Sequence, residues 1–205
     1  MPSVSNLEEK PYEASKYLET DLKCEQLKGS YLLRMLGRAL LVFPTGQGKT
    51  LTSLNAAFNQ ITSKILVFHP KGAHTSWRGD LLEHTNADFT EWPDMSGYII
   101  LIPHSRMKDF VKDFYCLSLL SSSVCIFDET DSFVNPTTTL YKSAVHISSL
   151  ARYLFGLTAT PIHNDLRSTY NVLSVFYPLE LASHSFASFF VLNVFVLRLP
   201  SIILW

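Results

Sequence analysis

The chain has 205 residues, of which 47% are apolar and 17% are charged, and its formal net charge is −1. A chain of this length can bury a hydrophobic core, and so apolar a composition excludes an intrinsically disordered protein. Because the charges nearly balance, bulk charge gives no argument for binding to nucleic acid.

Short apolar runs alternate with helical patterns along most of the chain. Five runs, typical of strands buried on both faces, lie at 39–43, 64–69, 98–102, 124–127 and 153–157. Helices are predicted where apolar residues recur at helical spacing, at Leu51, Leu54, Phe58 and Ile61, at Met107, Phe110, Val111 and Phe114, and at Leu166, Tyr170, Leu173 and Phe176. The alternation predicts an α/β fold, a parallel sheet with helices on both faces, in which ligands bind at the carboxyl ends of the strands.

A glycine-rich segment follows the first apolar run directly. The residues that match the end of the Walker A pattern, G-x-x-x-x-G-K-[ST], are Pro44, Thr45, Gly46, Gln47, Gly48, Lys49 and Thr50. The two glycines let backbone amides approach phosphate oxygens, and the helix that follows adds its positive end. Lys49 offers an ammonium to the outer phosphates and Thr50 a hydroxyl to Mg²⁺. The segment therefore predicts binding of ATP and Mg²⁺, the alternative being a chance glycine-rich turn. Phe43 occupies the first glycine position.

Two acidic residues, Asp128 and Glu129, follow the fourth apolar run in a Walker B arrangement. Asp128 is expected to hold Mg²⁺ through water, and Glu129 to orient and deprotonate the attacking water. Acidic residues also cap helices and turns, but the phosphate loop upstream favours a metal site. We therefore expect Lys49 and Asp128 to face one magnesium–triphosphate complex across adjoining strand ends.

Two hydroxyl side chains, Thr158 and Thr160, follow the fifth apolar run. Hydroxyl groups at a strand end can hydrogen-bond the carboxylates of a metal site and sense the γ-phosphate. We therefore assign both threonines to catalysis. The alternative is an ordinary Thr-Pro turn in front of a helix.

The order of these motifs resembles the first RecA-like lobe of superfamily 2 helicases, and within them the Swi/Snf-type ATPases. The segment GLTATPIHNDLRSTYNVLSVFYP is similar to the family's TGTPIQN segment, and DETDSFVNPTTTLYKSA is similar to its DEAH segment with the Asn-Pro that follows. LVFHPKGAHTSWRGDL, which contains Pro70 and Trp77, resembles the motif after the second strand. Lys10-Pro11-Tyr12-Glu13 resembles the adenine-recognising element Arg-Pro-Tyr-Gln, with Glu13 in the glutamine position.

The resemblance implies a RecA-like lobe that binds ATP and Mg²⁺ and contacts the backbone of double-stranded DNA. It assigns Tyr12 and Glu13 to adenine recognition. It also places the DNA-facing residues at 69–74 and 104–106, whereas Trp77 is expected to pack in the core. Three cations in or near these segments are suited to contact DNA phosphates: Lys71, Arg106 and Lys108. The alternative for each is an ordinary solvent-exposed surface charge.

No segment matches the family's second lobe, which carries the arginine finger. Since such an arginine contributes ~10³–10⁵ in rate, we expect the chain alone to bind ATP–Mg²⁺ but to hydrolyse it slowly. A second RecA-like lobe or another protein partner would complete the site. The family moves along double-stranded DNA by hydrolysing ATP, so the resemblance implies a DNA-dependent ATPase or translocase.

Three parts are predicted along the chain. They are an N-terminal helical segment with the adenine-recognition-like motif (1–37), a RecA-like ATP-binding domain (38–180) and an apolar tail (181–205), truncated or aberrant. The tail approaches the ~20 apolar residues of a membrane span, but Asn193, Arg198 and Pro200 count against one. The first residues have no apolar core typical of a signal peptide, and the few cysteines indicate reduced thiols. These features predict an intracellular protein, nuclear if eukaryotic and otherwise cytoplasmic.

Three other functions remain open at this point. One is a non-catalytic nucleotide-binding interaction module or decayed fragment, which docks on nucleic acid or protein without turnover. Another is a small P-loop phosphotransferase, against which the Thr-Ala-Thr-Pro segment and the Asn-Pro after the acidic pair both argue. The third is a membrane-anchored ATPase, which rests on the apolar tail alone.

Overall fold

A computed structural model describes residues 13–160, 166–178 and 202–204 of the chain. Its centre is a seven-stranded sheet of order β3-β4-β2-β5-β6-β1-β7, in which every pair of neighbours is parallel. The strands are β1 (Arg38–Val42), β2 (Ile65–His69), β3 (Phe89–Glu91), β4 (Ile99–Pro103), β5 (Val124–Phe127), β6 (Tyr153–Thr158) and β7 (Ile202–Leu204).

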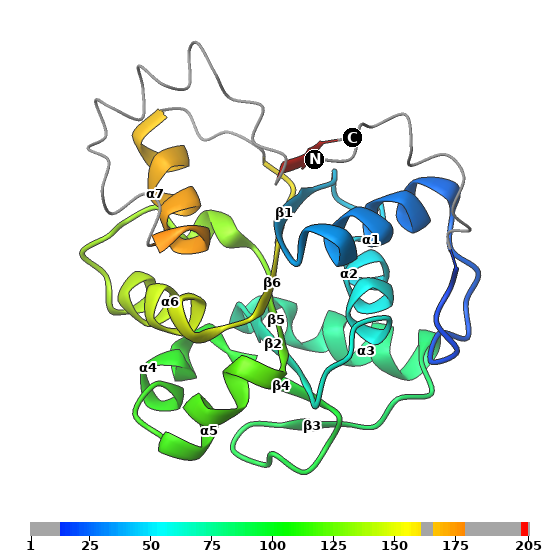
Figure 1. Ribbon diagram of the computed structural model, residues 1–205, viewed down its shortest axis with the longest axis horizontal. Helices are drawn as coiled ribbons and strands as arrows, with labels where there is room; N and C mark the ends of the chain where they lie inside the picture. Colours follow the sequence, from blue (N-terminus) through cyan, green and yellow to red (C-terminus); the bar gives the residue numbers. More distant parts are fainter. Residues whose placement is uncertain (1–12, 161–165, 179–201, 205) are drawn as a thin grey trace.

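Helices cover both faces of this sheet, as the sequence predicted. In Figure 1, α1, α2 and α3 lie on one side of the strands, and α4, α5, α6 and α7 lie on the other. The helices are α1 (Cys24–Leu36), α2 (Lys49–Phe58), α3 (His74–His84), α4 (Met107–Phe110), α5 (Phe114–Leu119), α6 (Thr139–Leu150) and α7 (Leu166–Phe176). The predicted α/β class, a parallel sheet with helices on both faces, is confirmed.

Two hydrophobic cores, one on each face of the sheet, hold these layers together. Strand β2 shows the alternation that creates them, because Leu66 and Phe68 belong to the core under α4–α7, whereas Ile65 and Val67 belong to the core under α1–α3. All five residues of β2 are buried. Burial on both faces explains why the strands are continuous apolar runs.

The five predicted runs all form strands, but two further strands were not predicted. β3 has three half-buried residues, too few to produce a recognisable apolar pattern. β7 lies in the segment predicted as an apolar tail, and Ile202, Ile203 and Leu204 pair with β1 at the edge of the sheet. Residues 179–201 lie outside the described part of the chain, so the tail boundary remains a prediction.

Two predicted helices end earlier than their apolar spacing suggested. α2 stops at Phe58, and Ile61, predicted on its apolar face, is 97% exposed. The pattern from Met107 to Phe114 is divided into α4 and α5, because Asp113 accepts a hydrogen bond from the backbone of Cys116 and thereby starts a new helix. Phe114 is consequently 87% exposed, and its predicted place on a buried face was wrong.

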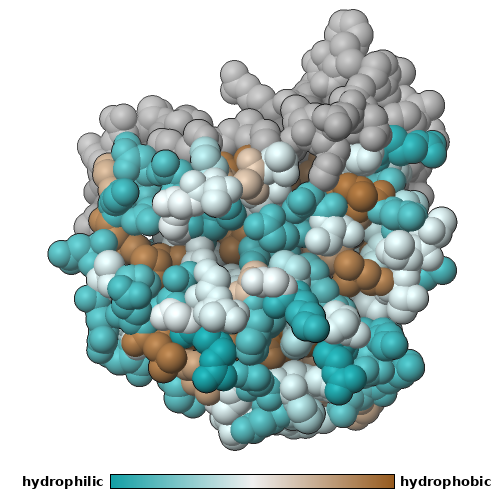
Figure 2. All heavy atoms as spheres, turned by 180° about the vertical axis from the view of Figure 1, so that it is seen from behind, coloured by the Kyte–Doolittle hydropathy of each residue, from teal (hydrophilic) through white to brown (hydrophobic). Residues whose placement is uncertain are grey.

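On the face shown in Figure 2, the described residues are mostly hydrophilic, with hydrophobic residues in separate small patches. Among the described residues, no helix has the length and apolarity needed to span a bilayer. The predicted N-terminal segment 1–37 includes α1, which packs on α2 and places Leu33 in the core under α1–α3. This helix therefore shares a hydrophobic core with the sheet and with α2 and α3.

Gly156, in the middle of β6, allows α7 to pack closely on the sheet. A Cβ atom at Gly156 would collide with the Phe176 ring and with the Leu40 side chain, both in the core. We predict that Gly156→Ala lowers the free energy of unfolding by about 1–3 kcal/mol, the usual cost of overpacking, in urea denaturation.

The matched control is Gly79→Ala on the exposed face of α3, where no atom lies within 4 Å of the added Cβ. Since alanine favours a helix over glycine by about 0.5–1 kcal/mol, this variant should be at least as stable as the parent. Equal stability of the Gly156→Ala variant and the parent would contradict the close packing of β6 against α7.

Candidate functional site

The loop between β1 and α2 has the backbone of a phosphate-binding loop. Gly46 and Gly48 adopt φ angles of 81° and 78°, a region that side chains rarely occupy. Helix α2 begins directly afterwards, at Lys49, so its first unpaired N–H groups belong to the loop. The loop thus offers backbone donors and a helix dipole to an anion, as the sequence predicted.

Lys49 folds back over this loop. Its Nζ donates a hydrogen bond to the carbonyl oxygen of Phe43 at 3.2 Å. Phe43 itself is 2% exposed and lies in the core under α1–α3. Its backbone N–H donates a hydrogen bond to the carbonyl oxygen of Thr158. Phe43 has no positive φ. A glycine is therefore not required at this position, which explains why the pattern tolerates phenylalanine there.

Asp128 follows β5 and is held by two hydrogen bonds. Its Oδ2 accepts from the indole Nε1 of Trp77 at 2.8 Å, and its Oδ1 accepts from the backbone N–H of Glu129 at 3.0 Å. The side chain is nearly buried. Burial raises the pKa of Asp128, and the hydrogen bond from Trp77 and the charge of Lys49 oppose that rise.

Glu129 lies beside Asp128 in a strained turn. It has a φ of 47°, the left-handed region, which no other described non-glycine residue adopts. Burial raises the pKa of Glu129, the negative charges of Asp128 and Asp131 raise it further, and Lys49 lowers it. A carboxylate with a raised pKa is a stronger base, as proton abstraction from water requires.

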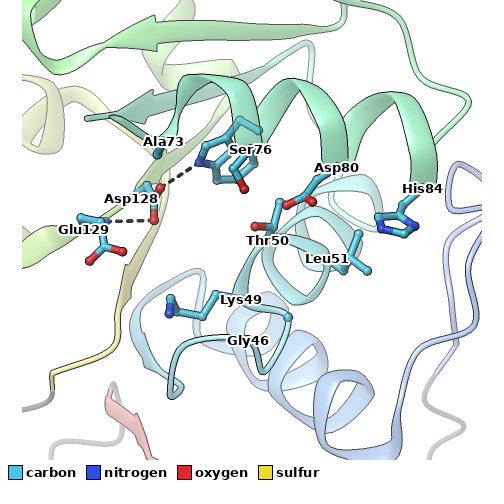
Figure 3. Close-up of a pocket in the computed structure, with 12 residues that line it drawn as sticks. Gly46, Lys49, Thr50, Leu51, Ala73, Ser76, Asp80, His84, Asp128 and Glu129 are labelled. Carbon is cyan, nitrogen blue, oxygen red and sulfur yellow. Dashed lines mark hydrogen bonds between the residues drawn. The ribbon is translucent and has the colours of Figure 1, made fainter. Parts of the chain in front are cut away.

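Lys49, Thr50, Asp128 and Glu129 line one cavity of about 390 Å³. In Figure 3, Lys49 and Glu129 lie at one end of this cavity, and Thr50 and Asp80 lie farther along it. Its remaining lining residues are Gly46, Gly48, Leu51, Ala73, Ser76, Trp77 and His84. The loop and the acidic pair thus meet, as predicted. They do not meet across adjoining strands, however, because β6 lies between β1 and β5.

Thr158 is the last residue of β6, the strand between β1 and β5, and Thr160 follows two residues later. Thr158 is buried and Thr160 is exposed. Thr158 Oγ1 accepts from the backbone N–H of Thr160 at 3.1 Å and donates to the carbonyl oxygen of Thr160 at 3.2 Å. Among the described residues, the two threonines thus hydrogen-bond to each other, and neither hydroxyl group bonds to Asp128 or Glu129.

A second cavity, of about 210 Å³, lies on the other side of the phosphate loop. Gln26, in the first turn of α1, is 7% exposed and lines it. Its amide donates to the carbonyl oxygen of Gln47 at 3.3 Å and accepts from the backbone of Lys23 at 2.8 Å. The other lining residues are Lys23, Glu25, Phe43, Pro44 and Gln47.

Gln26 was missed in the sequence, where Tyr12 and Glu13 were assigned to adenine. Tyr12 lies outside the described residues. Glu13 is exposed, its carbonyl accepts from Asn55 of α2 at 3.3 Å, and it lines neither cavity. The available signal for Gln26 was its position at the start of the helix that leads directly into β1.

The residues predicted to face DNA are only partly exposed. His69 is completely buried, so its predicted contact with DNA is wrong, whereas Lys71 and Lys108 are exposed. Arg106 forms an ion pair with Asp109 at 3.4 Å. Burial lowers the pKa of His104 to about 4, so this ring is neutral at physiological pH and adds no positive charge near Asp128.

Many solved structures have a fold similar to that of this chain, among them two from Sulfolobus solfataricus. The Sulfolobus solfataricus SWI2/SNF2 ATPase core in complex with double-stranded DNA superposes with a TM-score of 0.74 at 20% identity, over 88% of this chain and 40% of that one. The Sulfolobus solfataricus SWI2/SNF2 ATPase core domain gives a TM-score of 0.71 at 21% identity, over 89% of this chain and 40% of that one.

No family model and no curated protein sequence matches this chain. The chain spans 40% of the length of each of these two Sulfolobus chains. The resemblance that the motifs indicated is confirmed at the level of the fold: this chain folds as part of a SWI2/SNF2 ATPase core does.

Proposed function

We propose that this chain is the ATP-binding lobe of a helicase-like, DNA-dependent ATPase of the Swi/Snf type. The observation that carries the proposal is the shared cavity at the ends of β1 and β5, where the phosphate loop with Lys49 faces the carboxylates of Asp128 and Glu129. Among the groups that line this cavity are the Lys49 ammonium, the Thr50 hydroxyl and the carboxylates of Asp128 and Glu129, the types of group that phosphoryl transfer requires.

The residues around the cavity fit a magnesium–triphosphate complex. Gly46 is open on its Cβ side, with no atom within 4 Å, so phosphate oxygens can approach the loop amides. Lys49 is bound to a neutral carbonyl and can exchange this weak partner for phosphate. Thr50 and Asp128 supply the oxygen ligands that Mg²⁺ prefers. When bound, Mg²⁺ neutralises charge that develops on the phosphates.

Glu129 acts as the base that takes a proton from the attacking water, and its raised pKa suits this task. Thr158 and Thr160 stand at the end of β6, between the two halves of the cavity, where their hydroxyl groups can exchange their present bonds for bonds to the γ-phosphate. The same position couples the state of the nucleotide to the chain beyond β6.

We assign adenine recognition to Gln26 rather than to Glu13. A glutamine amide both donates and accepts hydrogen bonds, as the edge of adenine does, whereas an ionised glutamate only accepts. Gln26 also touches the loop through Gln47, so a base in the second cavity would lie next to the phosphates. Sequence alone could not relate α1 to the loop in this way.

Double-stranded DNA is the proposed partner, since a solved structure of similar fold, the Sulfolobus solfataricus SWI2/SNF2 ATPase core, is a complex with double-stranded DNA. Lys71 and Lys108, exposed near the carboxyl ends of β2 and β4, are suited to contact backbone phosphates. Such contacts position a protein on DNA without reading its sequence.

Lys49→Ala should weaken ATP binding at least tenfold, because the variant loses the ammonium that pairs with the outer phosphates. Isothermal titration calorimetry in the presence of Mg²⁺ measures this change. Lys112→Ala, which removes an exposed lysine outside both cavities, should leave the affinity as it is. Unchanged affinity in the Lys49→Ala variant would contradict the proposal that this loop binds the phosphates of ATP.

Gln26→Glu tests the adenine assignment separately. The carboxylate can still accept from Lys23 but can no longer donate, so ATP affinity should fall by about tenfold, whereas inorganic tripolyphosphate should bind as before. Gln60→Glu, the same change at a residue that bonds Arg34 and lines neither cavity, is the control. An equal loss for tripolyphosphate would show that Gln26 supports the loop rather than the base.

Turnover separates this lobe from a complete motor. Since the arginine finger belongs to the second lobe in the family and is worth ~10³–10⁵ in rate, the purified 205-residue chain should bind ATP but release phosphate very slowly, with or without double-stranded DNA. A phosphate-release assay measures this. Brisk DNA-stimulated hydrolysis by the chain alone would contradict the need for a second lobe.

A further inference from the structure

Trp77 occupies an unusual place for a core residue. Helix α3 is largely solvent-facing, and its two buried residues are Trp77 and Leu81. The Trp77 ring is 2% exposed and belongs to the core under α1–α3. Unlike its aliphatic neighbours in that core, it also lines the cavity that contains Lys49 and Asp128. Packing alone accounts for the ring but not for the direction of its N–H.

The indole N–H of Trp77 is aimed at one atom, Oδ2 of Asp128, at 2.8 Å (dashed line in Figure 3). A buried indole N–H needs a partner, and here that partner is the carboxylate at the end of β5. Oδ1 of the same carboxylate accepts from the backbone of Glu129. With both oxygens held, the Asp128 carboxylate cannot rotate about its terminal bond without losing a hydrogen bond.

Each carboxylate oxygen has a second lone pair. The two hydrogen bonds therefore fix the plane of the group while leaving an acceptor site on each oxygen for a cation or its water. Without the Trp77 donor, Oδ2 would be nearly buried with no partner on that side, and the carboxylate would gain rotational freedom. Outer-shell donors of this kind determine how well a ligand holds its metal.

We propose that Trp77 is a positioning residue for the metal carboxylate, orienting Asp128 through its indole N–H so that the phosphate loop can bind nucleotide with a divalent cation. This inference rests on the proposed function. It goes beyond it by giving α3, a helix outside both Walker elements, a defined part in metal binding. In this proposal Trp77 is not a metal ligand and acts through Asp128.

The test compares ATP binding in saturating Mg²⁺ with binding in EDTA, by calorimetry on the full chain. Trp77→Phe keeps an aromatic ring but has no N–H. We expect it to bind ATP in EDTA as the parent does, while the gain in affinity from Mg²⁺ falls on the order of tenfold. The control is Trp92→Phe, the same change at a ring that packs on the opposite core, which should leave the Mg²⁺ gain unaltered.

A double-mutant cycle separates positioning from general damage to the fold. In an Asp128→Asn background, where the metal ligand is already lost, Trp77→Phe should cause no further loss of the Mg²⁺ gain. If Trp77→Phe does not fold, 3-benzothienyl-alanine at position 77 preserves the ring shape with sulfur in place of the N–H, and the same result is expected.

Two results would overturn the role of Trp77 and leave the proposed function standing. One is a folded position-77 variant in which Mg²⁺ raises ATP affinity as much as it does in the parent. The other is a loss of this Mg²⁺ effect in the Asp128→Asn background as large as the loss in the parent background. Absence of Mg²⁺-dependent ATP binding in the parent chain would instead overturn the proposed function, and this inference with it. The two failures are therefore distinguishable in one set of titrations.

Discussion

The parallel direction of the strands is the constraint on which the candidate site depends. Because all neighbouring strands run the same way, the segments that follow β1, β5 and β6 all emerge at one edge of the sheet. Residues far apart in sequence, such as Lys49 and Asp128, therefore line one cavity although β6 separates their strands. Two apolar cores fix the sheet between its helices and so hold this edge rigid.

Local features were predictable from the sequence, and non-local ones were not. The phosphate loop, the acidic pair and the buried strands are each specified within a few consecutive residues, and the structure has them where the sequence placed them. The order of strands in the sheet is set by packing between distant segments, so the expectation of adjoining strands for Lys49 and Asp128 failed. Trp77 packs in the core as predicted, but the contact of Trp77 with Asp128 and that of Gln26 with the phosphate loop were not predicted, because they depend on how α1 and α3 pack on the loop and on β5.

The acidic pair shows how this fold combines stability with chemistry. Asp128 is removed from water, which disfavours its charge and raises its pKa, and two hydrogen bonds and the nearby Lys49 offset part of that cost. Glu129 has a strained backbone and a raised pKa, features that cluster at functional sites. At 20% identity to a SWI2/SNF2 ATPase core, a shared fold requires only the apolar pattern, whereas these polar arrangements carry the argument for function.

The most direct test of the central claim is a crystal structure of this chain with Mg²⁺ and a non-hydrolysable ATP analogue. We expect the β- and γ-phosphates on the amides of residues 46–50, with Lys49 released from the carbonyl of Phe43 to bind them. It also predicts the metal between Thr50 and Asp128 and the adenine beside Gln26. A nucleotide bound elsewhere, or a metal that contacts neither Thr50 nor the hydration shell at Asp128, would contradict it.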